Sequence, residues 1–142
     1  MYFCSINEKN DIKMKKTLLL FTVLLILCAC QESMEDRAAR DAKETTEKRC
    51  PIRLNDEGTL ILERINFDKI THTWRQDYLL DTEPGTLMEA DLRDLLLMEL
   101  KNTPSYKPYM DADFNFQYVY CMMSSPKDTL FNIILTPKDY RN

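Results

Sequence analysis

The chain has 142 residues, with 19 Lys and Arg against 23 Asp and Glu, and its formal net charge is −4. This acidic balance argues against nucleic acid as a partner, because phosphate binding needs a clustered basic face. Only two glycines are present, which excludes glycine-rich phosphate loops and dinucleotide-binding fingerprints.

The first predicted element is an export leader. Two lysines follow Met14, and residues 17–27 form an apolar run of 11 residues. A signal-peptide core has about 7–15 residues and a membrane-spanning helix needs about 20, so the run is too short for an anchor helix. It ends in Leu27-Cys28-Ala29-Cys30, which resembles the lipobox of bacterial lipoproteins, whose last cysteine is acylated and becomes the mature N-terminus. The resemblance implies a signal peptide over residues 14–29 and a lipid on Cys30.

The residues on either side of the leader bear on its start and its destination. Residues 1–13 carry Glu8 and Asp11, which are unusual ahead of a signal core, so we expect this stretch to be a gene-model extension. Gln31 is not the aspartate that retains many lipoproteins at the inner membrane, so the resemblance implies the outer membrane of the cell envelope. Residues 31–36 also look like the acidic export signals of Bacteroidetes surface lipoproteins, but acids at a helix start explain them equally. Surface or periplasmic orientation stays open.

Without residues 1–30 the chain is more acidic. Those residues hold four of the Lys and Arg and two of the Asp and Glu, which leaves 15 basic and 21 acidic residues and a net charge near −6. Such a chain does not adhere to anionic lipid by charge. Contact with the membrane is therefore expected through the acyl chains on Cys30.

Residues 30–49 are predicted to form a tether and a charged helix. Ser33 and Asp36 resemble a capping box, and helical spacing continues from residue 34 to residue 48. The apolar stripe is thin, with Ala38 and Ala42 among its few members. Such a helix either docks weakly on the domain or is a solvated stalk, and we expect a stalk in its first half.

Residues 50–142 are expected to be a single small domain that begins with a β-hairpin. Residues 59–68 and 71–80 are rich in β-forming residues and flank a turn. Alternation in the first strand is imperfect, which indicates a bulge or burial on two sides. Period-two counting along the second strand places Trp74 and Tyr78 on one side.

A helix and a second hairpin complete the predicted domain. A second capping box begins at Thr86, and an apolar stripe ends before Pro104; its leucines are Leu92, Leu95, Leu96, Leu97 and Leu100. Residues 114–123 and 129–136 follow as strands around turn residues. The predicted fold class is α+β: an N-terminal helix, then hairpin, amphipathic helix and hairpin, with the helix packed on one face of a four-stranded, mostly antiparallel sheet.

The mature stretch resembles small Bacteroidales lipoproteins of unknown function. The resemblance implies an envelope lipoprotein and brings no known activity or active site. The segments that carry it are Asp41 to Pro51, Thr71-His72-Thr73, Leu100-Lys101-Asn102, Phe114-Asn115-Phe116 and Thr136 to Tyr140.

Few residues are candidates for chemistry. Cys50 and Cys121 remain after the leader and Cys30 are set aside; in an exported protein they form either one disulfide or two buried thiols. His72 is the only histidine and is expected to be a structural or surface residue. The stretch 111–113 is a polar turn rather than a calcium loop, since it lacks the usual glycine and enough oxygen ligands. We expect no metal, no cofactor and no catalytic residue, and therefore no enzyme.

The remaining candidates are aromatic. Trp74, Tyr78, Tyr118 and Tyr120 either fill the core between sheet and helix or form a binding face on the uncovered side, where such rings suit a protein or glycan partner. Two functions follow. The first is a membrane-anchored, non-catalytic binding module that meets an envelope protein or glycan. The alternative is an inhibitor-like or immunity lipoprotein that protects the envelope from a toxin.

Overall fold

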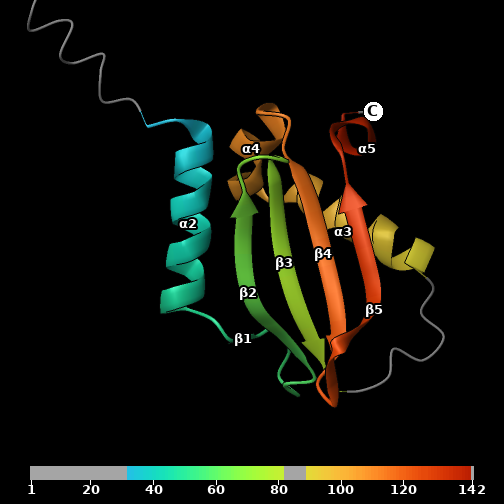
Figure 1. Ribbon diagram of the computed structural model, residues 1–142. Coiled ribbons are helices and arrows are strands. Elements are labelled where there is room, and N and C mark those ends of the chain that lie inside the picture. Colours follow the sequence, from blue (N-terminus) through green and yellow to red (C-terminus); the bar gives the residue numbers. More distant parts are fainter. Residues whose placement is uncertain (1–31, 82–88, 142) are drawn as a thin grey trace, which may run out of the picture. The chain divides into compact units, whose positions relative to one another are not determined.

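The computed structural model describes residues 32–81 and 89–141 (Figure 1). One structural unit runs from Ser33 to Asn142. The predicted leader, the expected gene-model extension over residues 1–13 and the predicted lipidation residue Cys30 lie outside the described residues. No helix in the described part combines the length and apolar character needed to cross a membrane.

The unit begins with helix α2 (Met34–Lys48), at the bounds that the sequence predicts. The Ser33 hydroxyl accepts a hydrogen bond from the Asp36 backbone N–H at 3.0 Å, which satisfies one of the unpaired donors of the first turn. Glu35 and Asp36 lie in that turn and Lys48 in the last one, which complements the helix dipole.

A five-stranded sheet follows, with strand order β1-β2-β3-β4-β5. Its strands are β1 (Ile52–Arg53), β2 (Leu60–Asp68), β3 (Thr73–Leu80), β4 (Asn115–Met122) and β5 (Ser125–Leu135). The predicted bulge is present, because the β2–β3 register shifts between Leu62 and Arg64. This shift puts Leu62 and Ile65, both buried, on the same side of the sheet.

The α+β class is confirmed, and three of the four strand pairs are antiparallel, but the predicted number of four strands is wrong and the sheet is mixed. The short strand β1 adds a fifth member. β3 and β4 pair in parallel, with Trp74 opposite Phe116 and Tyr78 opposite Tyr120. A parallel pair needs a long crossover, and here the crossover contains α3 (Glu89–Asn102), the 3₁₀ helix η1 (Pro104–Tyr106) and α4 (Lys107–Asp111).

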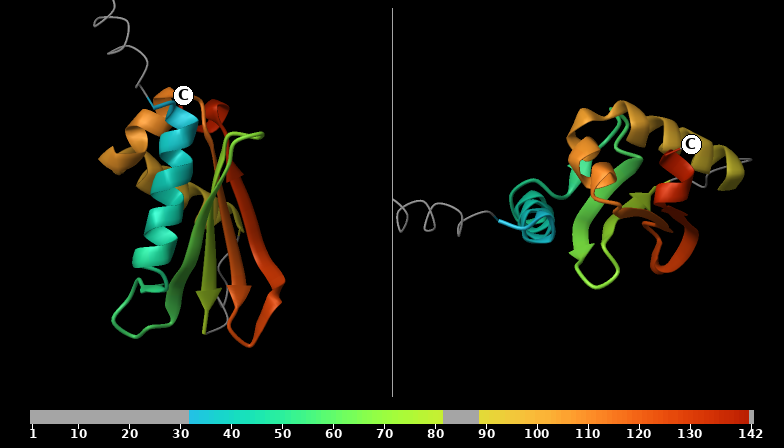
Figure 2. Two further views of the ribbon diagram at one scale, coloured as in Figure 1. Left: turned by 60° about the vertical axis from the view of Figure 1, so that its left-hand side comes forward. Right: turned by 90° about the horizontal axis from the view of Figure 1, so that it is seen from above.

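The crossover helices cover one face of the sheet, and α2 lies beside its β2 edge (Figure 2). The core fills the space between that face and the helices. Its largest fully buried side chains are Phe114, Phe116, Leu100, Ile133 and Leu135. A short C-terminal helix, α5 (Pro137–Tyr140), follows β5 and contributes the buried ring of Tyr140, which lies edge-on to Phe116.

Helix α3 packs through a narrower stripe than the sequence predicts. Leu96 and Leu100 are buried, with exposed fractions of 4% and 0%, whereas Leu95 is 53% exposed. Leu92 and Leu97 pack partly against the core. Because the core lies on one side of α3, the leucines at 92, 96, 97 and 100 contact it, and Leu95 points away.

Candidate functional site

The face of the sheet opposite the crossover helices is left uncovered by the described residues (Figure 2). Two hollows lie on it. One, of about 570 Å³, lies between α2 and the sheet, and the other, of about 520 Å³, lies over β2 to β5. Asn66 and Arg75 line both hollows, so the two form one trough, which we call the open-face trough.

Helix α2 forms one wall of this trough because it is docked along the edge of β2. The hydroxyl of Thr46 donates to the Ile65 carbonyl at 2.7 Å and accepts from the Ile65 N–H at 2.8 Å. Strand β1 pairs only with Ile61 and Leu62, so Thr46 satisfies edge groups that no strand reaches. The prediction of a solvated stalk in the first half of α2 is therefore wrong, and Ala38 at 0% exposure shows the packing that replaces it.

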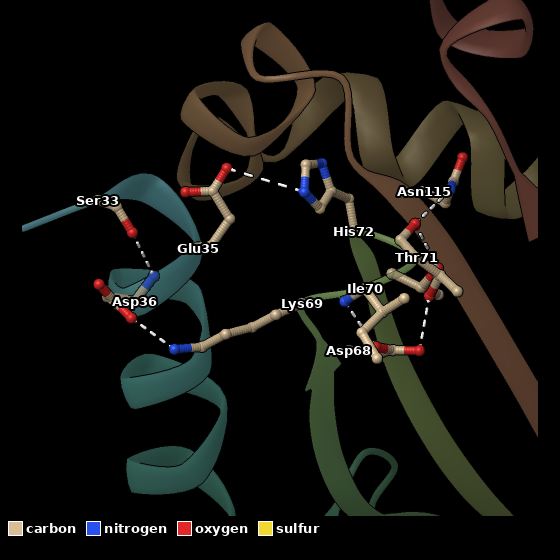
Figure 3. Close-up of polar contacts among 10 residues, drawn as sticks. Ser33, Glu35, Asp36, Asp68, Lys69, Ile70, Thr71, His72 and Asn115 are labelled. Atoms are coloured by element: carbon tan, nitrogen blue, oxygen red, sulfur yellow. Dashed lines mark hydrogen bonds and ion pairs between the residues drawn. The ribbon is translucent and has the colours of Figure 1, made fainter.

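The N-terminal end of α2 is joined to the β2–β3 turn (Figure 3). The Lys69 ammonium lies 2.5 Å from the Asp36 carboxylate, and the hydrogen bond it donates lowers the pKa of Asp36. His72 lies 3.9 Å from Glu35 and has a φ of 49°. The only histidine therefore lies in the strained turn that contacts α2, and this position indicates a structural role.

The same turn is fixed internally by Asp68 (Figure 3). Its carboxylate accepts from the Ile70 N–H and from the Thr71 hydroxyl, both at 2.8 Å. The Ile70 hydrogen bond is the main reason that the pKa of Asp68 is lowered. Asn115 donates its side-chain amide to the Thr71 carbonyl at 3.0 Å, so the turn is tied to β4 as well as to α2.

The centre of the trough holds two arginines on one carboxylate. Arg64 Nε lies 2.5 Å from one oxygen of Asp77, and Arg75 Nε lies 2.7 Å from the other. Asp77 is 6% exposed, and its hydrogen bond raises the pKa of the Arg64 guanidinium. This buried carboxylate fixes the position of two charged, partly exposed side chains.

The four aromatic side chains that the sequence offered as a possible binding face are buried, so the alternative of an exposed aromatic face is wrong. The exposed fractions of Trp74, Tyr78, Tyr118 and Tyr120 lie between 3% and 8%. Trp74 stacks on Tyr109 of α4 with 5.1 Å between ring centroids, and Tyr78 stacks on Tyr120 at 4.7 Å. Burial raises the pKa values of all three tyrosines. The four rings belong to the core because the crossover helices lie on their side of the sheet.

Of the two alternatives for Cys50 and Cys121, the structure has two free thiols and no disulfide between them. Cys50 precedes β1, whereas Cys121 lies in β4, and β2 and β3 separate the two strands. Neighbouring strands are about 4.8 Å apart, so three spacings exceed the roughly 7 Å between α-carbons that a disulfide can bridge. Burial raises the pKa of the Cys50 thiol.

Asp111 and Asp113 pair with cations instead of forming an oxygen-lined loop. Asp111 lies 3.4 Å from Lys107, and Asp113 lies 2.6 Å from Arg141. Across the described residues, no group of three or more His, Cys, Asp or Glu side chains is arranged to hold a metal ion.

The described residues thus form an α+β domain with one helix-covered and one open sheet face. Residues 33–131 match the family model described as Domain of unknown function (DUF8479), and the chain belongs to this family. No curated protein sequence matches the chain.

Solved structures with a similar fold include the pilotin EpsS of the Vibrio vulnificus type 2 secretion system. It has a TM-score of 0.61 and 14% identity, over 76% of this chain and 92% of the pilotin chain. A candidate secreted protein from Pseudomonas aeruginosa has a TM-score of 0.59 and 8% identity, over 78% of this chain and 100% of its own. The TM-scores show a shared fold, and at these low identities the likeness extends to the fold alone.

Proposed function

We propose that the protein is a lipid-anchored lipoprotein of the outer membrane and a non-catalytic module that binds an envelope protein in the open-face trough. The observation that carries this proposal is the open face itself, with its two joined hollows of about 570 and 520 Å³. The two similar structures, a secretion-system pilotin and a candidate secreted protein, support a role of this fold outside the cytoplasm.

The side chains in the trough suit binding rather than chemistry. The second hollow is lined mainly by amides and hydroxyls, which are Asn66, Thr71, Thr73, Asn115, Gln117 and Thr136. Such groups can donate and accept hydrogen bonds with a partner. The lipobox resemblance at Cys30 and the net charge near −6 after residue 30 support attachment by lipid rather than by a basic surface.

A protein partner is favoured over a glycan. Glycan recognition draws on exposed rings that combine apolar area with a polar tip. The tryptophan and the stacked tyrosines of this domain lie on the covered face, whereas the trough presents guanidiniums, amides and hydroxyls.

Photo-cross-linking in living cells tests the binding proposal. A photoreactive amino acid at Asn66, which is exposed and lines both hollows, should give one discrete protein adduct. The matched position Asp94 is exposed on α3, over the covered face, and should give none. Equal adducts from both positions, or none from Asn66, would contradict the proposal.

Exchange of Cys30 tests the anchor. Cys30→Ser should move the protein from the membrane fraction to the soluble fraction, because the acyl chains supply the attachment. Cys28→Ser alters the same leader two residues earlier and should leave the protein in the membrane fraction. Fractionation with labelled palmitate measures both. A Cys30→Ser protein that stays membrane-bound and labelled would disprove lipidation at this residue.

A further inference from the structure

The arginine pair in the trough is arranged to present donors to a ligand. Arg64 comes from β2 and Arg75 from the neighbouring strand β3, and each donates through Nε to a different oxygen of Asp77. A guanidinium carries five N–H donors in a rigid, planar fork. Using Nε leaves the two Nη groups of each side chain. Among the described residues, none of these Nη groups has a hydrogen-bond acceptor in the protein.

The Nη donors are exposed to solvent, but the side chains that carry them are held in one orientation. The side chains of Arg64 and Arg75 are 57% and 40% exposed, whereas that of Asp77 is 9% exposed. A buried carboxylate therefore restricts the orientation of two solvent-facing forks. An arginine side chain that is already held in this way loses less conformational entropy when a ligand binds than a freely rotating arginine does.

Other charged side chains surround the arginine pair in the trough. The hollow against α2 is lined by three cations and two carboxylates, namely Lys43, Arg64, Arg75, Glu47 and Asp77. Lys43 already lies 3.8 Å from Glu47, and Asp77 offsets one arginine. Glu63 also acts on the charge of Arg64, and Asp68 lines the second hollow with Arg75. The pair therefore offers a ligand its unused Nη donors rather than an excess of positive charge.

We propose that the Arg64–Arg75 pair binds a carboxylate of an acidic segment of the partner protein, which lies along the open-face trough. This inference rests on the proposed function and specifies the chemistry of the partner. A planar carboxylate accepts two parallel hydrogen bonds from a guanidinium fork.

Asp77 acts in this site as a positioning residue. Asp77→Asn removes a negative charge next to the pair, so a site governed by net charge alone would bind an acidic peptide more tightly. If the orientation of the forks governs binding, the same variant binds more weakly. The two accounts therefore predict opposite signs for one substitution.

The test uses the full-length lipoprotein in detergent and a fluorescein-labelled peptide of alternating serine and glutamate, followed by fluorescence anisotropy. Binding should weaken about tenfold in Arg64→Lys/Arg75→Lys, which keeps the ion pairs with Asp77 and the charge but removes the forks. It should also weaken in Asp77→Asn. Arg53→Lys makes the same exchange at an exposed arginine of β1 and should leave affinity unchanged. A serine–glutamine peptide should not bind.

Three results would overturn the inference: no binding by the unaltered protein, unchanged affinity in the double lysine variant, or tighter binding in Asp77→Asn. Displacement of the peptide by inorganic phosphate at lower concentration than by acetate would overturn the assignment to a carboxylate. The Asn66 cross-link separates the two proposals. If the adduct persists in the double lysine variant at its normal yield, the binding function stands and the carboxylate assignment fails.

Discussion

Replacing Leu100 with alanine is expected to lower the free energy of unfolding by about 2–5 kcal/mol. Leu100 is 0% exposed and packs from α3 into the core over the covered face. Alanine at this position loses the transfer free energy of the removed atoms and leaves a cavity in the core, which the surrounding residues fill only in part. Urea unfolding followed by circular dichroism measures the change.

Leu95→Ala is the matched control for this prediction, since it makes the same exchange in the same helix. Leu95 is 53% exposed, so its replacement should change the free energy of unfolding by about 0.5 kcal/mol or less. Similar losses for the two variants would contradict the orientation of α3 and would favour the wider stripe that the sequence predicts.

Replacing Thr46 with valine is expected to lower the free energy of unfolding by about 1–3 kcal/mol, because the Ile65 N–H and carbonyl then lose their partner in a partly buried place. Valine keeps the shape and the β-branch, so packing changes little. The loss of these two hydrogen bonds weakens the docking of α2 on β2. Hydrogen exchange at the Ile65 amide should therefore become faster in the variant.

Thr45→Val provides the control one residue away. Thr45 is also partly buried in α2, and among the described residues its hydroxyl makes no hydrogen bond. The exchange should be close to neutral, within about 0.5 kcal/mol. Equal destabilisation by the two valines would mean that helix propensity, and not the Thr46 link, accounts for the loss.

Local signals in the sequence predicted the elements well. The Ser33 cap, the apolar alternation of β4 and the bulge in β2 all depend on neighbours within a few residues. The direction of β4 relative to β3, in contrast, does not depend on neighbouring residues. It depends on the path of the crossover through η1 and α4, and Pro104 reads in the sequence only as the end of a helix.

The wrong predictions have the same origin. Whether Trp74 and Tyr118 are covered depends on which face the crossover helices take, and period-two counting defines two faces without saying which is covered. Likewise, the distance between Cys50 and Cys121 follows from the order of the strands in the sheet, and the number of residues between the two cysteines does not determine that order.

The arginine pair could be predicted only in part. Period-two counting puts Arg75 and Asp77 on the side of β3 opposite Trp74, which is a weak signal for a charged pair on an open face. Arg64 joins them because the bulge between Leu62 and Arg64 shifts the register. The imperfect alternation indicates a bulge but not its position, so the sequence alone does not place Arg64 on the face of Arg75 and Asp77.

The claim that the open face is occupied in the envelope is tested most directly by hydroxyl-radical footprinting of the unaltered protein. Ile134, which lines the trough, is 44% exposed, and Leu95 over the covered face is 53% exposed. Purified protein should be oxidised at both residues. In intact cells Ile134 should be protected while Leu95 reacts as before. Equal oxidation of Ile134 in cells and in the purified protein would contradict the account.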